Sequence, residues 1–294
     1  MVHAAERALL SAAACKARVR SNWTPARWTR DFLHTRKWPA RHASYADCAR
    51  HGTSSSTAIV DLSQPAIFER AFDSWPDPSQ WTIENLEHTF GEAECAVGDD
   101  DDDEDVAIVM QLADYLSYAR QQQDDCPLYI FDDSILDEHE TLGAAYAAPP
   151  CLPEDELRSM PDRPPHRWAL IGCTRTGSAP HQDPDYTAAW NTLVCGRKRW
   201  FFYPPEVAEA KVYAGAADDA VERSSAAHWL HECYPQLAHL PGVEVEQRAG
   251  ETVYVPSRFW HCVVNLELSV SVTANFVHHG NAAEATAAMR ARGV

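Results

Sequence analysis

The sequence predicts a mostly β protein with flanking helices, in which antiparallel strands close into a sandwich or barrel. After residue 165, short runs rich in β-branched and aromatic residues follow one another closely, each bounded by Gly, Pro or Asn. The 294 residues are 45% hydrophobic and 10% aromatic, which suits a large folded core. No apolar run approaches the roughly 18 residues of a membrane helix. A disordered, a fibrous and a membrane-spanning chain are therefore not expected.

The first 57 residues are predicted to form a basic, aromatic-rich helical arm. Residues 2–20 follow a helical pattern, and a stripe of large apolar side chains continues at loosely helical spacing between residues 23 and 38. The chain has a formal charge of −18, but residues 1–42 hold nine basic and two acidic residues, so the remainder carries −25. We expect the arm to lie on the acidic body. Contact with nucleic acid or a membrane surface, and a role as an organellar transit peptide, stay open as alternatives.

The polar residues 51–57 separate this arm from a second domain, residues 58–294. Its first half is predicted to contain a strand at 58–62, a helix at 79–90 capped near Ser79 or Thr82, a helix at 108–120 and a strand at 128–131. Seven consecutive acidic residues at 99–105 are typical of a solvated loop. Calcium binding is a weaker alternative there, because the run lacks the glycine and the spaced ligands of a calcium loop.

The second half holds the predicted β core, at about 165–280. Its strands are expected at 167–172, 187–194, 199–203, 251–255, 261–265 and 268–277. Shorter helical patterns occupy 206–213 and 225–233.

The nine cysteines are spread along the chain and include no Cys-x-x-Cys pair. Neither a disulfide framework nor a thiolate zinc site is therefore indicated. Free thiols are typical of a reducing compartment, so we expect a nuclear or cytoplasmic protein.

Three residues stand out as candidate metal ligands. His181 and Asp183 are separated by one residue, and on an extended segment such side chains project to the same face. His261 follows a strand and a turn led by proline, and is the best candidate for a third ligand. Two His and one carboxylate leave open positions on an octahedral ion, as in non-haem Fe(II) oxygenases. Zinc is the competitor, although structural zinc prefers four protein ligands.

The context of these residues resembles the Jumonji-C (JmjC) oxygenases. The resemblance extends over roughly residues 60–280 and is greatest to the group that contains the bifunctional arginine demethylase and lysyl-hydroxylase. The segments that carry it are Pro127 to Asp132, Pro164 to Trp168, Ser178 to Pro184, Ala189 to Asn191, Gly196 to Trp200, Gly250 to Pro256, Trp260-His261 and Thr273 to Phe276.

The resemblance implies a double-stranded β-helix of the cupin, or jelly-roll, type, with Fe(II) held by His181, Asp183 and His261. It also implies that 2-oxoglutarate chelates the metal, that Lys198 binds its distal carboxylate, and that Thr273 shares this carboxylate. The other residues implied to line the co-substrate are Asn191, Tyr129 and Ser178. Judged without the resemblance, Lys198 in the basic run 197–199 is more typical of a solvated hairpin.

The residue pattern agrees with a polar ligand inside the β core. Ser271, Thr273 and Asn275 alternate with apolar residues, so one face of that strand is polar. A dianionic acid needs an ammonium and neutral donors around it. Gln182 and the Asp185-Tyr186 pair differ from the common residues beside the triad, so substrate selection is expected to differ.

The predicted function is hydroxylation of a protein side chain, with lysine favoured. N-methyl demethylation by the same chemistry, a catalytically inactive cupin-type adaptor and a tRNA hydroxylase remain as alternatives. The acidic body predicts a basic, Lys- and Arg-rich protein segment as partner, and makes nucleic acid less favoured. The oligomeric state stays open.

Overall fold

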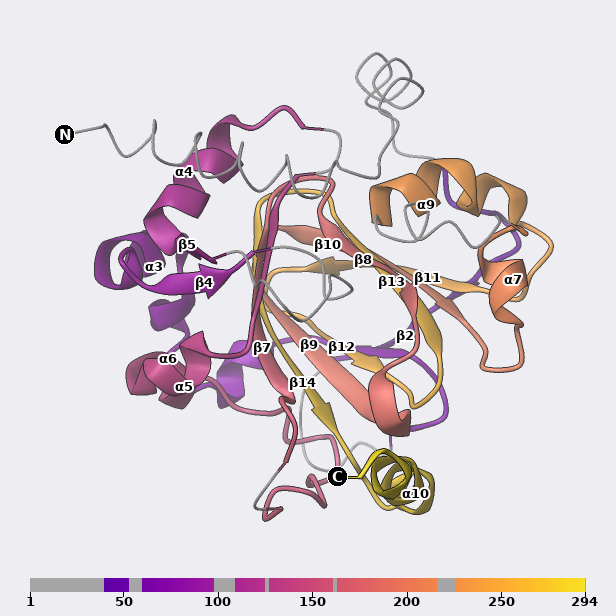
Figure 1. Ribbon diagram of the computed structural model, residues 1–294. Helices are drawn as coiled ribbons and strands as arrows, with labels where there is room; N and C mark the ends of the chain where they lie inside the picture. Colours follow the sequence, from indigo (N-terminus) through magenta and orange to yellow (C-terminus); the bar gives the residue numbers. More distant parts are fainter. Residues whose placement is uncertain are drawn as a thin grey trace.

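Two β-sheets with an apolar layer between them form the centre of the fold (Figure 1). The structure is a computed structural model that describes residues 40–52, 60–97, 109–124, 127–160, 163–215 and 226–293. The major sheet has seven strands in the order β2-β3-β12-β9-β14-β7-β6, and the minor sheet has five in the order β1-β11-β10-β13-β8. Strand pairs are antiparallel except β1 with β11 and β2 with β3.

The strands of the major sheet are β2 (Ala49–His51), β3 (Ala66–Phe68), β6 (Tyr129–Asp132), β7 (Arg167–Gly172), β9 (Ala188–Cys195), β12 (Thr252–Val255) and β14 (Ser269–Phe276). Those of the minor sheet are β1 (Ala46–Asp47), β8 (Gly177–His181), β10 (Arg197–Tyr203), β11 (Val243–Arg248) and β13 (Trp260–Asn265). A separate hairpin pairs β4 (Glu94–Ala96) with β5 (Val109–Gln111).

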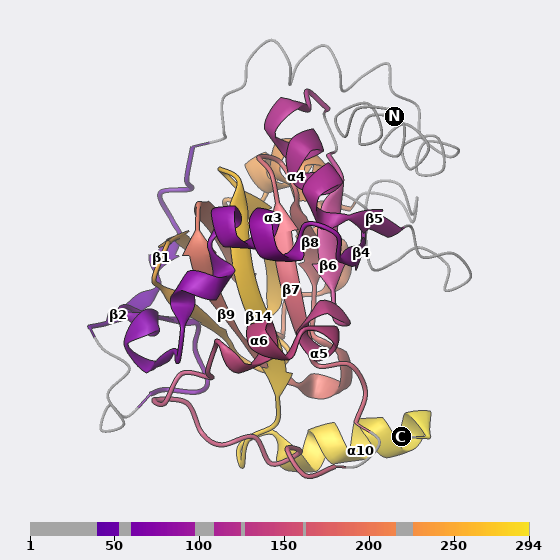
Figure 2. The ribbon, with the colours of Figure 1, turned by 90° about the vertical axis from the view of Figure 1, so that its left-hand side faces the viewer.

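Helices cover the outer faces of both sheets. The helices α3 (Ile83–Phe90), α4 (Leu112–Gln121), α5 (Ile135–Glu138) and α6 (Glu140–Ala144) lie in front of the major sheet in Figure 2. On the minor sheet pack α7 (Glu209–Val212) and α9 (Ala226–Glu232), and α10 (Ala282–Arg292) lies at one end of the fold. No helix among the described residues is both long and apolar enough to cross a bilayer.

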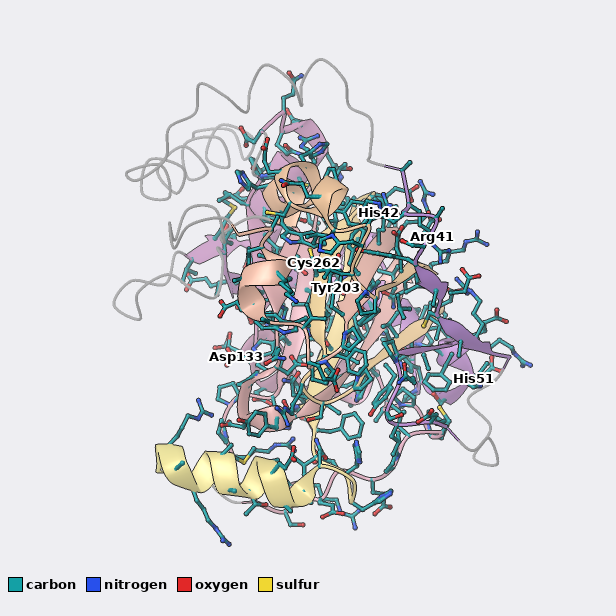
Figure 3. The ribbon with its side chains drawn as sticks, turned by 90° about the vertical axis from the view of Figure 1, so that its right-hand side faces the viewer. Arg41, His42, His51, Asp133, Tyr203 and Cys262 are labelled. Atoms are coloured by element: carbon teal, nitrogen blue, oxygen red, sulfur yellow. The ribbon has the colours of Figure 1, made fainter. Side chains whose placement is uncertain are left out.

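Three apolar layers follow from this arrangement. The layer between the sheets takes side chains from both, among them Val253 and Val255 of β12 and Trp200 and Phe202 of β10. The alternate residues of the same strands face outward: Phe201 and Tyr203 join the layer under α9, where Figure 3 shows Tyr203 close to Cys262. This is a layered, mostly β architecture of two packed sheets with flanking helices, and the predicted fold class is confirmed.

Most predicted elements are present, with corrected bounds. The helix predicted at 79–90 is α3, preceded by a 3-10 turn at Pro78–Trp81, and Thr82 caps α3 by accepting a hydrogen bond from the Asn85 amide. The helix predicted at 108–120 begins only at Leu112, because the preceding residues pair with β4 as strand β5.

One predicted strand is absent from the described residues, and several strands were not predicted. Residues 60–62 of the predicted strand 58–62 are not in a strand, because the Asp61 side chain accepts hydrogen bonds from the Ser63 amide and hydroxyl and forms a turn instead. The strand of this region is β3, after Pro65. Strands β8 and β11 were not predicted. The sequence of β8 contains Gly and Pro, which are rare in strands. In β11 Val alternates with Glu, and burial of these residues depends on pairing with strands distant in sequence.

The N-terminal arm up to residue 39, the domain boundary predicted at 57/58 and the acidic run 99–105 lie outside the described residues. The boundary therefore stays a prediction. Residues 40–52, which precede it, add β1 and β2 to the two sheets.

Candidate active site

The three predicted metal ligands lie together at one end of the minor sheet. His181 is the last residue of β8, Asp183 follows it in the turn, and His261 is the second residue of β13. Pairing of β8 with β13 places His181 directly opposite His261, with ring centroids 4.1 Å apart. One ligand atom of each of the three residues lies within 4.8 Å of the others, so together they could hold one metal ion.

Both imidazoles present the same nitrogen to the space between them. The Nδ1 atom of His181 lies 2.8 Å from the Ala179 carbonyl oxygen, and that of His261 lies 3.1 Å from the Phe259 carbonyl oxygen. Since a carbonyl only accepts, each Nδ1 carries a proton, and Nε2 is the nitrogen left to face a metal. Burial, together with the neighbouring His181, lowers the pKa of His261 to about 4, against an opposing effect of Asp183, so the ring is neutral at pH 7. Neutral imidazoles are the form that binds a metal.

The carboxylate of Asp183 is only partly satisfied. Its Oδ1 accepts a hydrogen bond from Asn275 Nδ2 at 3.2 Å and lies 4.0 Å from His261 Nε2. Its Oδ2 is buried and has no hydrogen-bond partner among the described residues. A buried carboxylate oxygen beside two imidazole lone pairs needs a cation, so the donor set fits a divalent metal.

Lys198 lies deeper on the same inner face of the minor sheet. Lys198, Trp200 and Phe202 are every second residue of β10, so all three face inward. Phe202 pairs with His261, whereas Lys198 pairs with Asn265. Four residues of strand separate the two levels, about 13 Å. The metal ligands and Lys198 therefore line one lumen at two depths.

The ammonium of Lys198 has an unusual environment. The side chain is 1% exposed, and its Nζ donates to the Ser271 hydroxyl at 2.6 Å. Burial lowers the pKa of Lys198 to about 7. Asn191 Nδ2 lies 3.5 Å from the same hydroxyl, while Asn191 Oδ1 is buried without a hydrogen-bond partner among the described residues. A carboxylate placed here would gain one ammonium and neutral donors.

The strand β14 supplies the polar wall of this lumen. Its apolar residues Val270 and Val272 face the outer helical layer, so Ser271 and Thr273 face inward. Thr273 lies directly opposite Asn191, and its hydroxyl donates to the Trp190 carbonyl at 2.8 Å. The partner of Lys198 is thus Ser271, and the predicted role of Thr273 stays a prediction.

A β-bulge decides the direction of Ser178. Between the pairs Ser178–Val263 and His181–His261, β8 contains one more residue than β13. Residues that pair directly share a face, so the bulge places Ser178 on the same side as His181 although they are three apart in sequence. Simple alternation would have placed them on opposite faces.

Tyr129 reaches the site from the edge of the major sheet. It pairs with Gly172, which in turn pairs with Ser269 on the polar face of β14. A side chain on Gly172 would lie 2.7 Å from the Tyr129 ring and 2.4 Å from the Asn265 amide, so the glycine leaves room for both.

Two aromatic residues stand nearer the open end of this wall. Trp168 pairs with Thr273 and therefore faces the lumen, and its ring centroid lies 5.5 Å from that of Phe131. Both side chains are partly exposed. Trp190 and Trp200, by contrast, are buried in apolar layers. Pairing across β7 and β14 gives Trp168 this direction, and the sequence alone does not show it.

The turns that flank the metal ligands are strained and locked together. Asp185, Tyr186 and Arg258 have φ angles of 53°, 54° and 65°, in the left-handed region that favours glycine. Each such residue costs about 1–3 kcal/mol and persists only where its surroundings fix it. Here Gln182, which stands between His181 and Asp183, donates to the Arg258 carbonyl at 2.6 Å.

Comparison with known proteins gives this geometry a context. The family model of the cupin-like domain matches residues 53–282. The chain is 38% identical over 228 residues to the Lysine-specific demethylase JMJ21 of Arabidopsis thaliana, covering 75% of this chain and 24% of that protein.

Two further relatives match a similar region. The Bifunctional arginine demethylase and lysyl-hydroxylase psr-1 of Caenorhabditis elegans is 33% identical over 72% of this chain and 55% of its own length. The 2-oxoglutarate and iron-dependent oxygenase JMJD4 of Mus musculus is 28% identical over 74% of this chain and 56% of its own length. The chain spans about half or less of the length of these relatives.

Proposed function

The chain belongs to the cupin-like domain family, in its JmjC group, and from this membership we propose that it is an Fe(II)- and 2-oxoglutarate-dependent oxygenase that hydroxylates a lysine side chain of a protein. One observation carries the proposal: the metal-ligand triad and the buried ammonium of Lys198 line the same lumen at two depths. A metal-chelating dicarboxylic acid has one group for each, a chelating end for the triad and a distal carboxylate for the ammonium.

The residues of the chain have distinct tasks in this reaction. His181, Asp183 and His261 would hold the iron, which when bound supplies the activation of dioxygen coupled to oxidative decarboxylation of 2-oxoglutarate to succinate and CO2. Lys198 and Ser271 bind the distal carboxylate and orient the acid. Asn275 fixes the Asp183 carboxylate by its hydrogen bond.

The apolar residues of the lumen exclude water from the reacting end. The indole of Trp200 lies nearly parallel to the His261 ring, with centroids 6.3 Å apart, and Phe202 lies 6.4 Å away. Exclusion of water strengthens the charge interactions inside the site and prevents side reactions.

Lysine as the target is supported by the partly exposed pair Trp168 and Phe131. Their ring faces suit an aliphatic stem that ends in a cation. The name of psr-1 includes a lysyl-hydroxylase.

Demethylation of an N-methylated side chain is the second candidate. The names of JMJ21 and psr-1 both contain a demethylase activity, and hydroxylation of an N-methyl carbon uses the same site. Mass spectrometry separates the two, because hydroxylation adds one oxygen to the peptide whereas demethylation removes a methyl group and releases formaldehyde.

Anaerobic titration tests the proposed function. Fe(II) and then 2-oxoglutarate are added to the purified protein without oxygen, and the weak visible absorption band of a ternary complex is followed; succinate is then measured after exposure to air. Wild type should show the band and form succinate. Asp183→Ala should show neither while keeping its circular dichroism spectrum, because Asp183 lies in a turn after the end of β8 and belongs to none of the apolar clusters.

A protein that forms no band and no succinate would contradict the proposal and favour a metal-free binding module. If wild type forms the band and Asp183→Ala still turns over 2-oxoglutarate, Asp183 is not part of the site.

A further inference from the structure

The turns beside the metal ligands hold an arginine, Arg258, whose one carboxylate contact among the described residues is long. The Arg258 guanidinium lies over the Tyr186 ring, 5.2 Å from its centroid. Its nearest carboxylate among the described residues is Glu284, at 3.9 Å, and both side chains are about half exposed, 47% and 58%. Arg199 and Arg50, by comparison, each lie 2.6 Å from a glutamate oxygen.

The position of Arg258 is fixed at several points. Its carbonyl accepts from Gln182, and the Tyr186 carbonyl beneath it accepts from Ser257 Oγ at 2.7 Å and Asn281 Nδ2 at 2.9 Å. The neighbouring Asp185 is paired with Arg292 of α10. Two turns and one helix thus hold the backbone that carries the guanidinium and the ring.

This place lies where the lumen opens. The level of Lys198 is closed, since that side chain is 1% exposed, whereas His181 and Asp183 are partly exposed at the other end. Tyr186 follows Asp183 by three residues, and Arg258 precedes His261 by three. The turns that carry Tyr186 and Arg258 therefore lie directly beside the partly exposed ligands, where a substrate bound at the triad would meet them.

The strained backbone of these turns is typical of a functional position. Left-handed φ at Tyr186 and Arg258 is unfavourable for both residues, and glycine would occupy either position without that cost. An exposed cation–π contact offsets only part of such strain. Tyr186 is also 42% exposed, one of the two most exposed large apolar side chains among the described residues.

We propose that Arg258, held over Tyr186, recognises a carboxylate of the substrate peptide, an Asp or Glu side chain at a fixed distance from the target residue. The planar guanidinium offers paired donors that match a carboxylate, and the Tyr186 ring fixes its plane. The inference rests on the proposed function, because it names the recognition element of that same site. It is compatible with a basic substrate segment, since one acidic residue then sets which lysine reaches the metal.

A peptide series tests the proposal with the full chain. Peptides with one central lysine carry Glu, Gln or Lys in turn at each flanking position, and their binding is measured by fluorescence anisotropy, which needs no turnover. Wild type should bind the Glu peptide about 10-fold more tightly than the Gln peptide at one position. Arg258→Gln and Arg258→Gly should reduce this ratio to about 2-fold or less, and Arg258→Glu should favour the Lys peptide at that position.

Two further variants make the test specific. Arg258→Lys keeps the charge without the paired donors and should restore part of the ratio. Arg290→Gln removes the same charge from an exposed residue of α10 and should keep the wild-type ratio. Arg258→Gly is suited to the left-handed φ, so a loss of binding preference there does not reflect misfolding.

Three results would overturn the proposal: equal binding of the three peptides by wild type, a wild-type preference for Lys at every position, or a Glu preference that survives in Arg258→Gln and Arg258→Gly. Each differs from failure of the proposed function, which would appear as absent 2-oxoglutarate binding and turnover whatever the peptides do.

Discussion

Single residues in the site are buried with fewer partners than their polar groups require. Asp183 keeps one carboxylate oxygen without a hydrogen bond among the described residues, and Lys198 is enclosed with the Ser271 hydroxyl beside its ammonium. Such groups are costly in a folded protein unless a ligand completes them. These two groups therefore support the proposal that a cation binds at one depth and an anion at the other.

Replacement of Lys198 by Ala should weaken 2-oxoglutarate binding. A hydrogen bond to a charged group contributes about 1.5–3 kcal/mol, so the KM for 2-oxoglutarate should rise about 10- to 100-fold. Iron binding, measured by anaerobic titration, is the control, because the triad lies four residues of strand away. An unchanged KM would assign the distal carboxylate to another cation, such as Arg197.

The pH dependence of 2-oxoglutarate binding should follow Lys198. Burial lowers its pKa to about 7 in the free protein, whereas a bound carboxylate requires the protonated form. Binding above pH 7 must then take up a proton, so affinity should fall by up to about 10-fold per pH unit. In the unfolded chain this lysine keeps its ordinary pKa, so between about pH 7 and 10 the unfolded state binds one more proton than the folded state. The free energy of unfolding of the free protein should therefore increase as the pH rises through this range.

Calorimetric titration of 2-oxoglutarate in buffers of different ionisation enthalpy measures the proton uptake directly. Lys198→Met, which has a similar length and no charge, should lose both the proton uptake and the slope above pH 7. A wild-type affinity that stays constant from pH 7 to 9 would show that the ammonium remains charged without its ligand.

At the scale of elements, β8 carries His181 and Ser178 and is one of the strands that the sequence did not predict. Its residues Gly177 to His181 have little intrinsic preference for a strand, and they are held extended by pairing with β13. The spacing of His181 and Asp183 predicts that their side chains share a face. The bulge that turns Ser178 to the same side has no local sequence signal. Long-range pairing decides it.

Gly177→Ala should destabilise the protein through this strand. Gly177 has a φ of 144°, and an added Cβ would lie 1.9 Å from the Val263 carbonyl oxygen of β13. Because the obstacle is backbone, β8 must move, and we expect a loss of roughly 3 kcal/mol in the free energy of unfolding. Urea denaturation measures it.

Gly52→Ala is the matched control for that prediction. An added Cβ there meets no atom within 4 Å, so its free energy of unfolding should stay within about 0.5 kcal/mol of wild type. Equal midpoints for both variants would mean that β8 can shift without cost.

The strands of the core were predictable where apolar and polar residues alternate or where apolar runs are bounded by turn residues. Strand β7 matches its predicted bounds, and β14 shows the predicted polar face. Strand β11 was not recognised, because its Glu244 is buried through an ion pair with Arg199, 45 residues away in sequence. The left-handed φ of Tyr186 and Arg258 was invisible for the same reason: contacts distant in sequence impose it.

At the scale of the molecule, the layered architecture separates stability from function. The two outer apolar layers lie under the helices, and the inner layer holds the lumen between the sheets. Changes under α3 or α9 should therefore affect stability before they affect the site. The roles assigned to the lumen residues stay predictions until ligand binding is measured.

Charge is also a property of the whole molecule, and it makes a prediction about the substrate. Outside residues 1–42 the chain carries −25, so we propose that a Lys- and Arg-rich protein segment is attracted to it. Attraction between exposed charges weakens as salt shortens the Debye length to about 8 Å at 0.15 M. For a basic peptide, kcat/KM should then fall steeply between low and physiological salt, whereas turnover of 2-oxoglutarate without peptide should change little.

A variant without residues 1–42 sharpens this test, because the seven surplus positive charges of that segment compete with the peptide for the acidic surface. Its preference for basic over neutral peptides should exceed that of the full chain, measured as a ratio of kcat/KM values at low salt. The local carboxylate preference assigned to Arg258 should persist at physiological salt, since it arises from direct hydrogen bonds and not from long-range attraction. Salt-independent activity on basic peptides, or a preference for acidic peptides or RNA, would show that the overall charge does not select the substrate.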